Sequence, residues 1–138
     1  MREKKYTAAL IGTGRIGFTL GFDSKREQPA SHTMALLANK RIDLLAGCDN
    51  NSSRLAHWHR FVKKSDVFAE YSFLFATTKV DVVVIAVNET FHLETALAAI
   101  RFKPKLIILE KPVALNAAQG EQILLEAKKH FVPIMINH

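Results

Sequence analysis

The sequence predicts an α/β protein with a doubly wound parallel sheet, a Rossmann fold, in which strands and helices alternate. Short apolar runs recur along the chain, each run is almost uniformly apolar, and a glycine-rich turn follows the first run. Strands buried on both faces have this continuous hydrophobic character, because helices cover both sides of their sheet. The predicted strands lie at 7–11, 44–48, 82–87, 106–109 and 133–136, with a weaker candidate at 67–69.

Helical stretches separate these strands. In the clearest one, apolar residues recur on one face, and Asn116 followed three residues later by Gln119 is typical of a capping box. An extra polar loop over 21–30 lies before Ser31, where the helix that follows the glycine-rich turn continues. Successive strand–helix–strand units predict one dinucleotide-binding domain over residues 1–138. The predicted helices lie at 31–39, 52–62, 71–77, 91–102 and 116–130.

The composition is that of an ordinary soluble domain. Of the 138 residues, 49% are hydrophobic and 23% are charged, which is close to the average for globular proteins. The longest apolar run, 82–87, is far shorter than the ~20 residues of a membrane-spanning helix. The net charge of +6 is scattered and forms no basic stripe of the kind that binds nucleic acid. We therefore expect a cytoplasmic protein whose partners include neither nucleic acid nor membrane.

The single cysteine, Cys48, lies inside an apolar run. One cysteine cannot form an intramolecular disulfide. A lone thiol in a buried strand is usually a small core residue, so we do not expect a catalytic role. The sequence also shows no ligand pattern for a metal ion, and we expect none to be bound.

The glycine-rich turn between the first strand and first helix is the strongest functional motif. A G-x-G-x-x-G in this context is typical of a dinucleotide site. The first glycine permits the tight turn, the second lets backbone approach a pyrophosphate, and the third allows close helix–strand packing. The helix N-terminus adds free N–H groups and the positive end of a dipole. The predicted cofactor-binding residues here are Gly12, Thr13, Gly14, Arg15, Ile16 and Gly17.

An acidic side chain at the end of the second strand normally accepts hydrogen bonds from the adenosine ribose, and Asp49 lies there. Its distance from the glycines exceeds the usual ~20 residues because of the polar loop. A solvated turn aspartate is the alternative reading. A carboxylate would repel a 2′-phosphate, which favours NAD, although Arg54 and Asn50 leave NADP possible.

Two further segments follow the fourth and fifth predicted strands. Val87, Asn88 and His92 lie at the edge where strand order is expected to reverse, although His92 by itself is more typical of a helix-start residue than of a catalyst. Glu110 and Lys111, followed by Pro112, end the fifth strand. A lysine there can donate to a substrate oxygen or to the nicotinamide carboxamide. The alternative is a strand-end salt bridge before a helix-breaking proline.

In their order, the glycine turn, Asp49, the strand–helix turn at His92 and the Glu110-Lys111-Pro112 triplet resemble the N-terminal domain of Gfo/Idh/MocA oxidoreductases. The resemblance covers essentially the whole chain and implies hydride transfer between NAD or NADP and a sugar, cyclitol or related polyol. It implies that Lys111 contacts the nicotinamide and the substrate hydroxyl as the catalytic residue.

The chain also departs from the family pattern. Val87-Asn88 stands where relatives commonly have Thr-Pro. The family's second domain, an antiparallel sheet that carries a catalytic histidine, most substrate contacts and the oligomer interface, is absent from these residues. We expect the full-length protein to be a homo-oligomer and these residues alone to be inactive.

Three functions fit the motifs to different degrees. An NAD(P)-dependent dehydrogenase uses every motif, including Lys111. A non-catalytic regulatory module that senses a dinucleotide would keep the glycine turn and could keep the lysine as a carboxamide contact. A methyltransferase shares the glycine turn and acidic strand end but has no use for Glu110-Lys111-Pro112. The sequence therefore favours the dehydrogenase.

Overall fold

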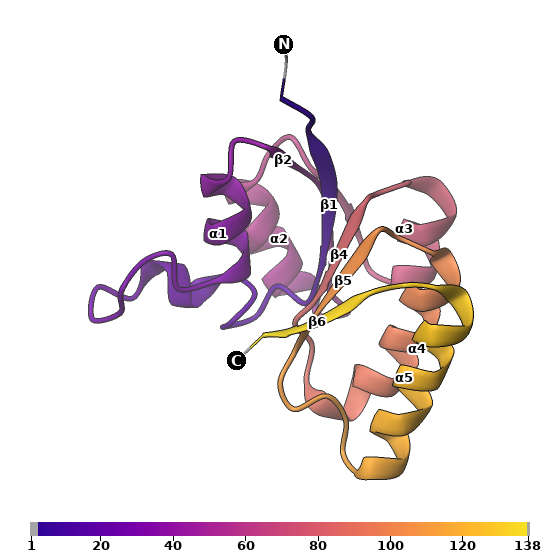
Figure 1. The fold of residues 1–138 in the computed structure, drawn as a ribbon. Helices are drawn as coiled ribbons and strands as arrows, with labels where there is room; N and C mark the ends of the chain where they lie inside the picture. Colours follow the sequence, from indigo (N-terminus) through magenta and orange to yellow (C-terminus); the bar gives the residue numbers. More distant parts are fainter. Residues whose placement is uncertain (1–2, 138) are drawn as a thin grey trace.

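The computed structural model describes residues 3–137 and contains one sheet of six parallel strands (Figure 1). Their spatial order is β3-β2-β1-β4-β5-β6, and every neighbouring pair is parallel. The predicted fold class is confirmed, and the weak candidate at 67–69 is a short edge strand. The strands are β1 (Tyr6–Ile11), β2 (Ile42–Cys48), β3 (Asp66–Phe68), β4 (Val82–Ile85), β5 (Leu106–Glu110) and β6 (Ile134–Asn137).

Helices cover both faces of the sheet. In Figure 1, α1 and α2 lie on one side and α3, α4 and α5 on the other, in agreement with the two separate core clusters that they form with the strands. Short 3₁₀ turns, η1 (Thr19–Phe22) and η2 (Glu89–Phe91), precede α1 and α4. The α-helices are α1 (His32–Ala38), α2 (Ser52–Phe61), α3 (Tyr71–Thr77), α4 (His92–Phe102) and α5 (Ala117–His130).

Polar side chains define where three of these helices begin. Ser31, Asn51 and Asn116 each accept a hydrogen bond from the backbone N–H three residues later, which satisfies a donor left free at a helix start. The expected capping box at Asn116 is modified, because Gln119 Oε1 accepts from Leu115 N–H, one residue before the cap. The caps place α1, α2 and α5 as the sequence predicts.

A chain of contacts around Trp58 joins α2, α1 and the glycine turn. Trp58 is fully buried, and its ring occupies the space that a side chain at Gly47 would need. Its Nε1 donates to Thr33 Oγ1 at 3.0 Å, and that hydroxyl donates to the Gly17 carbonyl at 2.6 Å. The core on this face therefore fixes the end of the glycine turn.

A loop interrupts the first helix. After one helical turn the chain leaves the axis, and α1 resumes with His32 N–H bonded to Ile16 O and Thr33 N–H bonded to Gly17 O. In an uninterrupted helix these carbonyls would accept from residues 20 and 21, so His32 stands twelve positions later than a continuous helix requires. We call residues 20–31 the insertion. It projects at the left of Figure 1 and contains the predicted polar loop.

None of the helices within residues 3–137 is long and apolar enough to cross a membrane.

Deletion of residues 20–31, which joins Thr19 to His32, should leave a continuous first helix. The deletion removes two aromatic contacts of Phe22, with Phe18 and Phe61, worth about 0.5–1.5 kcal/mol each. It also avoids a loop-closure entropy of about 2 kcal/mol. Because these effects oppose each other, we expect cooperative thermal unfolding with Tm within roughly 5 °C of the parent chain. Circular dichroism measures this, and a broad, non-cooperative transition would contradict an insertion into an otherwise regular helix.

Candidate functional site

A cavity of about 870 Å³ lies at the carboxyl ends of β1 to β4. β1 and β4 are neighbours, but the chain leaves them toward opposite faces of the sheet, and such a switch point is where doubly wound folds bind ligands. The cavity is lined by residues 11–16, Thr19, Leu20, Arg26, 48–50, Arg54, His57, 69–72, 86–88, Phe91, Glu94 and Thr95.

The three glycines meet different surroundings. Gly12 has φ of +100°, and a Cβ there would lie 2.5 Å from Ala86 O. At Gly17 a Cβ would lie 2.1 Å from Gly12 O. At Gly14 the nearest atom would be Arg54 Nη1 at 3.8 Å. The fold itself therefore requires Gly12 and Gly17, whereas the absent side chain of Gly14 leaves open space where a phosphate can approach the backbone.

The Asp49 carboxylate joins the end of β2 to the glycine turn. Its Oδ2 accepts from Thr13 N–H at 2.9 Å and from the Thr13 hydroxyl at 3.0 Å. Its Oδ1 accepts from Asn51 N–H at 2.8 Å. Asp49 is 8% exposed, so the alternative of a solvated turn residue is wrong. Oδ1 keeps one lone pair for a further hydrogen bond from the cavity side.

Charged side chains line the cavity on distinct elements. Arg15 lies within the glycine turn, Arg54 lies in the first turn of α2, and Arg26 belongs to the insertion. The acidic residues besides Asp49 come from elsewhere: Glu70 caps α3 and Glu94 lies in α4. The elements beside the glycine turn therefore supply positive charge.

Two titratable groups in the cavity wall are held neutral. Burial raises the pKa of the Cys48 thiol to about 12, and the Asp49 and Glu70 carboxylates act in the same direction. Cys48 is 3% exposed, in agreement with its interpretation as a small buried residue. Burial also raises the pKa of Tyr71, as does the Glu94 carboxylate. The Tyr71 hydroxyl therefore remains a hydrogen-bond donor at neutral pH.

Glu110 joins three elements at the end of β5. It is 8% exposed, and its Oε1 accepts from His32 Nε2 at 2.6 Å and from Asn137 Nδ2. An ionised carboxylate can only accept, so Nε2 of His32 carries the proton. The Glu110 carboxylate therefore connects the start of α1 and strand β6 to the end of β5. Lys111, joined to Pro112 by a cis peptide bond, is exposed.

His92 has a structural environment. It is 1% exposed, with Nε2 lying 3.0 Å from Val87 O and Nδ1 3.3 Å from Val113 O. It therefore connects the turn after β4 to the segment after β5. Four predicted site residues lie outside the cavity lining within residues 3–137, and their contact with a cofactor stays a prediction: Gly17, His92, Glu110 and Lys111.

The other predicted residues gather around the cavity, and several lining residues were not predicted. The segment 69–72 follows β3 and reaches the same edge; the weak strand signal at 67–69 could have pointed to it. No local pattern marks Arg26, His57, Phe91 or Glu94. His138 and residues 1–2 lie outside the described part of the chain. Within residues 3–137, no group of three His, Cys, Asp or Glu side chains is arranged to hold a metal ion.

Comparison with known families identifies the domain. The model of the Gfo/Idh/MocA oxidoreductase family, NAD-binding Rossmann fold, matches residues 6–138. The chain belongs to this family. Its match covers the glycine turn, Asp49 and the Glu110-Lys111-Pro112 triplet, so the resemblance inferred from these motifs is confirmed. The domain is accordingly an NAD-binding domain, and the glycine turn with its open position at Gly14 fits that cofactor. No curated protein sequence matches the chain.

Solved structures share the fold. The WlbA dehydrogenase from Chromobacterium violaceum, crystallised with NADH and UDP-GlcNAcA, aligns with 99% of the chain at 20% identity and a TM-score of 0.83. Myo-inositol 2-dehydrogenase from Lactobacillus plantarum aligns with 97% at 22% identity and 0.79. A probable dehydrogenase from Thermotoga maritima aligns with 95% at 24% identity and 0.79. The chain spans only 36%, 36% and 35% of these proteins, respectively.

Valine substitutions at two glycines should separate binding from folding. Gly14→Val should abolish NADH binding while changing stability by less than about 0.5 kcal/mol, because the side chain enters open space. Gly17→Val should destabilise the domain by about 3 kcal/mol or more, because its Cβ meets the Gly12 carbonyl. Thermal unfolding and NADH titration of both variants provide the measurement. Full NADH affinity in Gly14→Val would show that no phosphate lies beside that glycine.

Proposed function

We propose that this chain is the cofactor-binding part of a dehydrogenase that transfers a hydride between NAD and a sugar, cyclitol or related polyol. The observation that carries the proposal is the cavity at the switch point, with a glycine turn open at Gly14. Dehydrogenases of an inositol and a nucleotide sugar are among the proteins that share the fold. The chain spans little more than a third of the length of these proteins. The substrate class is therefore part of what we propose.

The lining residues have separate proposed roles along the dinucleotide. The backbone N–H groups around Gly14 bind the pyrophosphate, as helix N-termini bind anions. The free lone pair of Asp49 Oδ1 accepts a hydrogen bond from an adenosine ribose hydroxyl. Val87 and Asn88, at the end of β4, hold the nicotinamide side. The bound nicotinamide supplies the site that gives or takes the hydride.

Lys111 is the proposed catalytic residue. It directly follows Glu110, whose carboxylate is held by His32 and Asn137, so the backbone before Lys111 is firmly placed. Its ammonium can donate to a substrate hydroxyl oxygen and can move a proton at that oxygen. The buried Glu110 is a positioning residue, because its carboxylate is occupied by structural hydrogen bonds.

NADH should bind more tightly than NADPH, by about tenfold or ~1.4 kcal/mol. The Asp49 carboxylate faces the adenosine ribose in this proposal, and it would repel a 2′-phosphate. Titrations of the unmodified chain with both cofactors at equal ionic strength measure the ratio. Tighter NADPH binding would mean that the Arg54 guanidinium dominates this end of the cavity. Absence of NADH binding would refute the dinucleotide site altogether.

Residues 1–138 by themselves should show no measurable turnover. Lys111 is exposed and outside the cavity, so no wall formed by residues 3–137 encloses a substrate at its ammonium. Orientation of substrate against cofactor supplies several kcal/mol of barrier reduction, up to ~7–11 kcal/mol. The assay follows NADH absorbance with a panel of inositols, sugars and sugar acids. Turnover that disappears in Lys111→Ala would contradict the expectation and place the substrate site within this chain.

A further inference from the structure

The insertion contributes to the dinucleotide site. We propose that it carries a phosphate-binding residue, Arg26, to the cavity wall, where Arg26 acts together with Arg15 and Arg54 on phosphate groups of the cofactor. The inference rests on the proposed function, since it requires a dinucleotide in this cavity. It assigns a binding role to a loop that lies outside the glycine motif.

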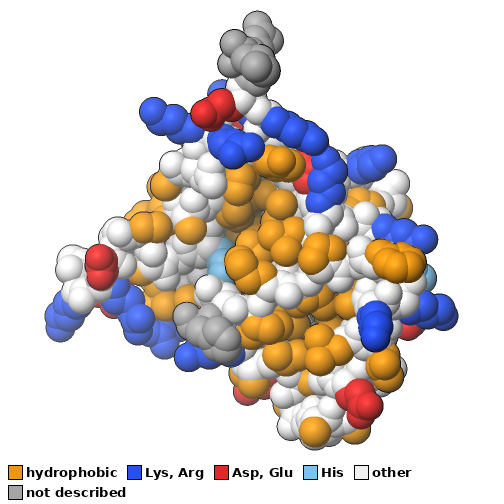
Figure 2. All heavy atoms as spheres, viewed as in Figure 1, with side chains coloured by type: hydrophobic (Ala, Val, Ile, Leu, Met, Phe, Trp, Pro, Cys, Tyr) orange, Lys and Arg blue, Asp and Glu red, His pale blue; other side chains and the backbone are white. Residues whose placement is uncertain are grey.

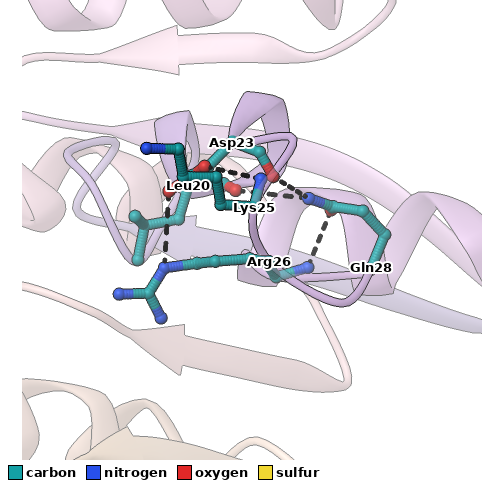
Figure 3. A network of polar contacts seen from close by, with 6 residues as sticks. Leu20, Asp23, Lys25, Arg26 and Gln28 are labelled. Carbon is teal, nitrogen blue, oxygen red and sulfur yellow. Dashed lines mark hydrogen bonds and ion pairs between the residues drawn. The ribbon is translucent and has the colours of Figure 1, made fainter.

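The insertion is built so that Arg26 has a defined position. Arg26 N–H donates to Asp23 O at 3.1 Å, and its Nε lies 3.7 Å from Asp23 Oδ2. Lys25 N–H donates to the other Asp23 carboxylate oxygen at 2.9 Å. The Gln28 amide closes the loop by donating to Asp23 O at 3.2 Å and Leu20 O at 3.4 Å. Figure 3 shows these residues converging on one small network, which holds the loop backbone at Arg26 and limits the entropy that the loop loses when a ligand binds.

The base of the insertion is also anchored to the body of the domain. Phe22 makes edge contacts with Phe18 at 5.2 Å and with Phe61 of α2 at 5.3 Å between ring centroids. Gly21 lies so close to α1 that a Cβ would be 2.3 Å from the Met34 side chain. These contacts hold the base of the insertion against the helices on this face. Leu20 and Arg26 form part of the cavity wall.

The chemistry of the wall matches a phosphate group. Three arginines from three parts of the chain line the cavity, and Arg54 Nη1 is the atom nearest to the open position at Gly14. The ion pair of Arg26 uses only its Nε, and the two side chains are 54% and 38% exposed, so it holds the guanidinium weakly. Among residues 3–137, the only side-chain partner of Arg26 is Asp23, at Nε, so its terminal nitrogens can make a paired interaction with phosphate oxygens, which guanidinium geometry favours. Figure 2 shows Lys and Arg side chains along the lower edge of the projecting loop.

A dinucleotide offers two sources of this chemistry: the pyrophosphate of every NAD or NADP molecule, and the 2′-phosphate of NADP alone. The test therefore compares NADH, NADPH and adenosine as ligands. Lys25 provides a matched control, because it is a neighbouring cation on the same loop that does not line the cavity. The variants are Arg26→Ala and Lys25→Ala, each first checked for an unchanged Tm.

Arg26→Ala should weaken NADH binding roughly tenfold, whereas Lys25→Ala should change it less than about twofold. The affinity for adenosine, measured by competition, should be the same for both variants as for the parent chain. An equal loss for NADH and NADPH supports a contact with the pyrophosphate, and a loss confined to NADPH supports a contact with the 2′-phosphate.

Unchanged affinity of Arg26→Ala for both cofactors would overturn the inference while leaving the proposed function intact, provided that the parent chain binds NADH. An equal loss for adenosine would also overturn it, because the effect would then not depend on phosphate. Absence of NADH binding by the parent chain would overturn the proposed function and the inference together.

Discussion

The glycine turn passes so close to the end of β4 that no side chain fits at Gly12. Gly12 N–H bonds to Cys48 O at the end of β2, and Ala86 N–H bonds to Ile11 O at the end of β1. These bonds draw the turn against Ala86, where any side chain at Gly12 would overlap the carbonyl. Gly17 packs on Gly12 in the same way. The Gly17 carbonyl also accepts a hydrogen bond from the Thr33 hydroxyl, which in turn accepts one from Trp58 Nε1. The rest of the site depends on this close approach, since it places the carboxyl ends of β1, β2 and β4 around one cavity.

Asp49 shows how a single carboxylate serves both fold and site. Its three hydrogen bonds with Thr13 and Asn51 join the glycine turn to the start of α2. The same interactions keep its charge at the cavity wall although the side chain is almost buried. The proposed preference for NAD is therefore coupled to the fold at this position: a substitution that changes the charge would also loosen the turn.

A similar coupling joins the far end of the sheet. Glu110 bonds to His32, which begins α1 immediately after the insertion, and to Asn137 in the edge strand. The position of the segment that carries Lys111 thus depends on contacts with both ends of the sheet. His92, whose ring nitrogens lie within hydrogen-bond distance of the Val87 and Val113 carbonyls, packs between the turn after β4 and the segment that follows Lys111. Two histidines therefore connect the cofactor edge to the proposed catalytic segment without lining the cavity.

The order of strands and helices, the glycine turn and the acidic strand end follow from the sequence alone, because hydrophobic periodicity and turn chemistry are local properties. The same local signals predicted that the polar loop interrupts the first helix. They could not show that Arg26 lines the cavity, since that depends on how Phe22 and Gly21 dock on α1 and α2. They also could not show that the strand-end Glu110 is bonded to His32, 78 residues away. Which side chains face the cofactor and which hold the scaffold is decided by tertiary structure, because strand order brings together residues that no local pattern relates.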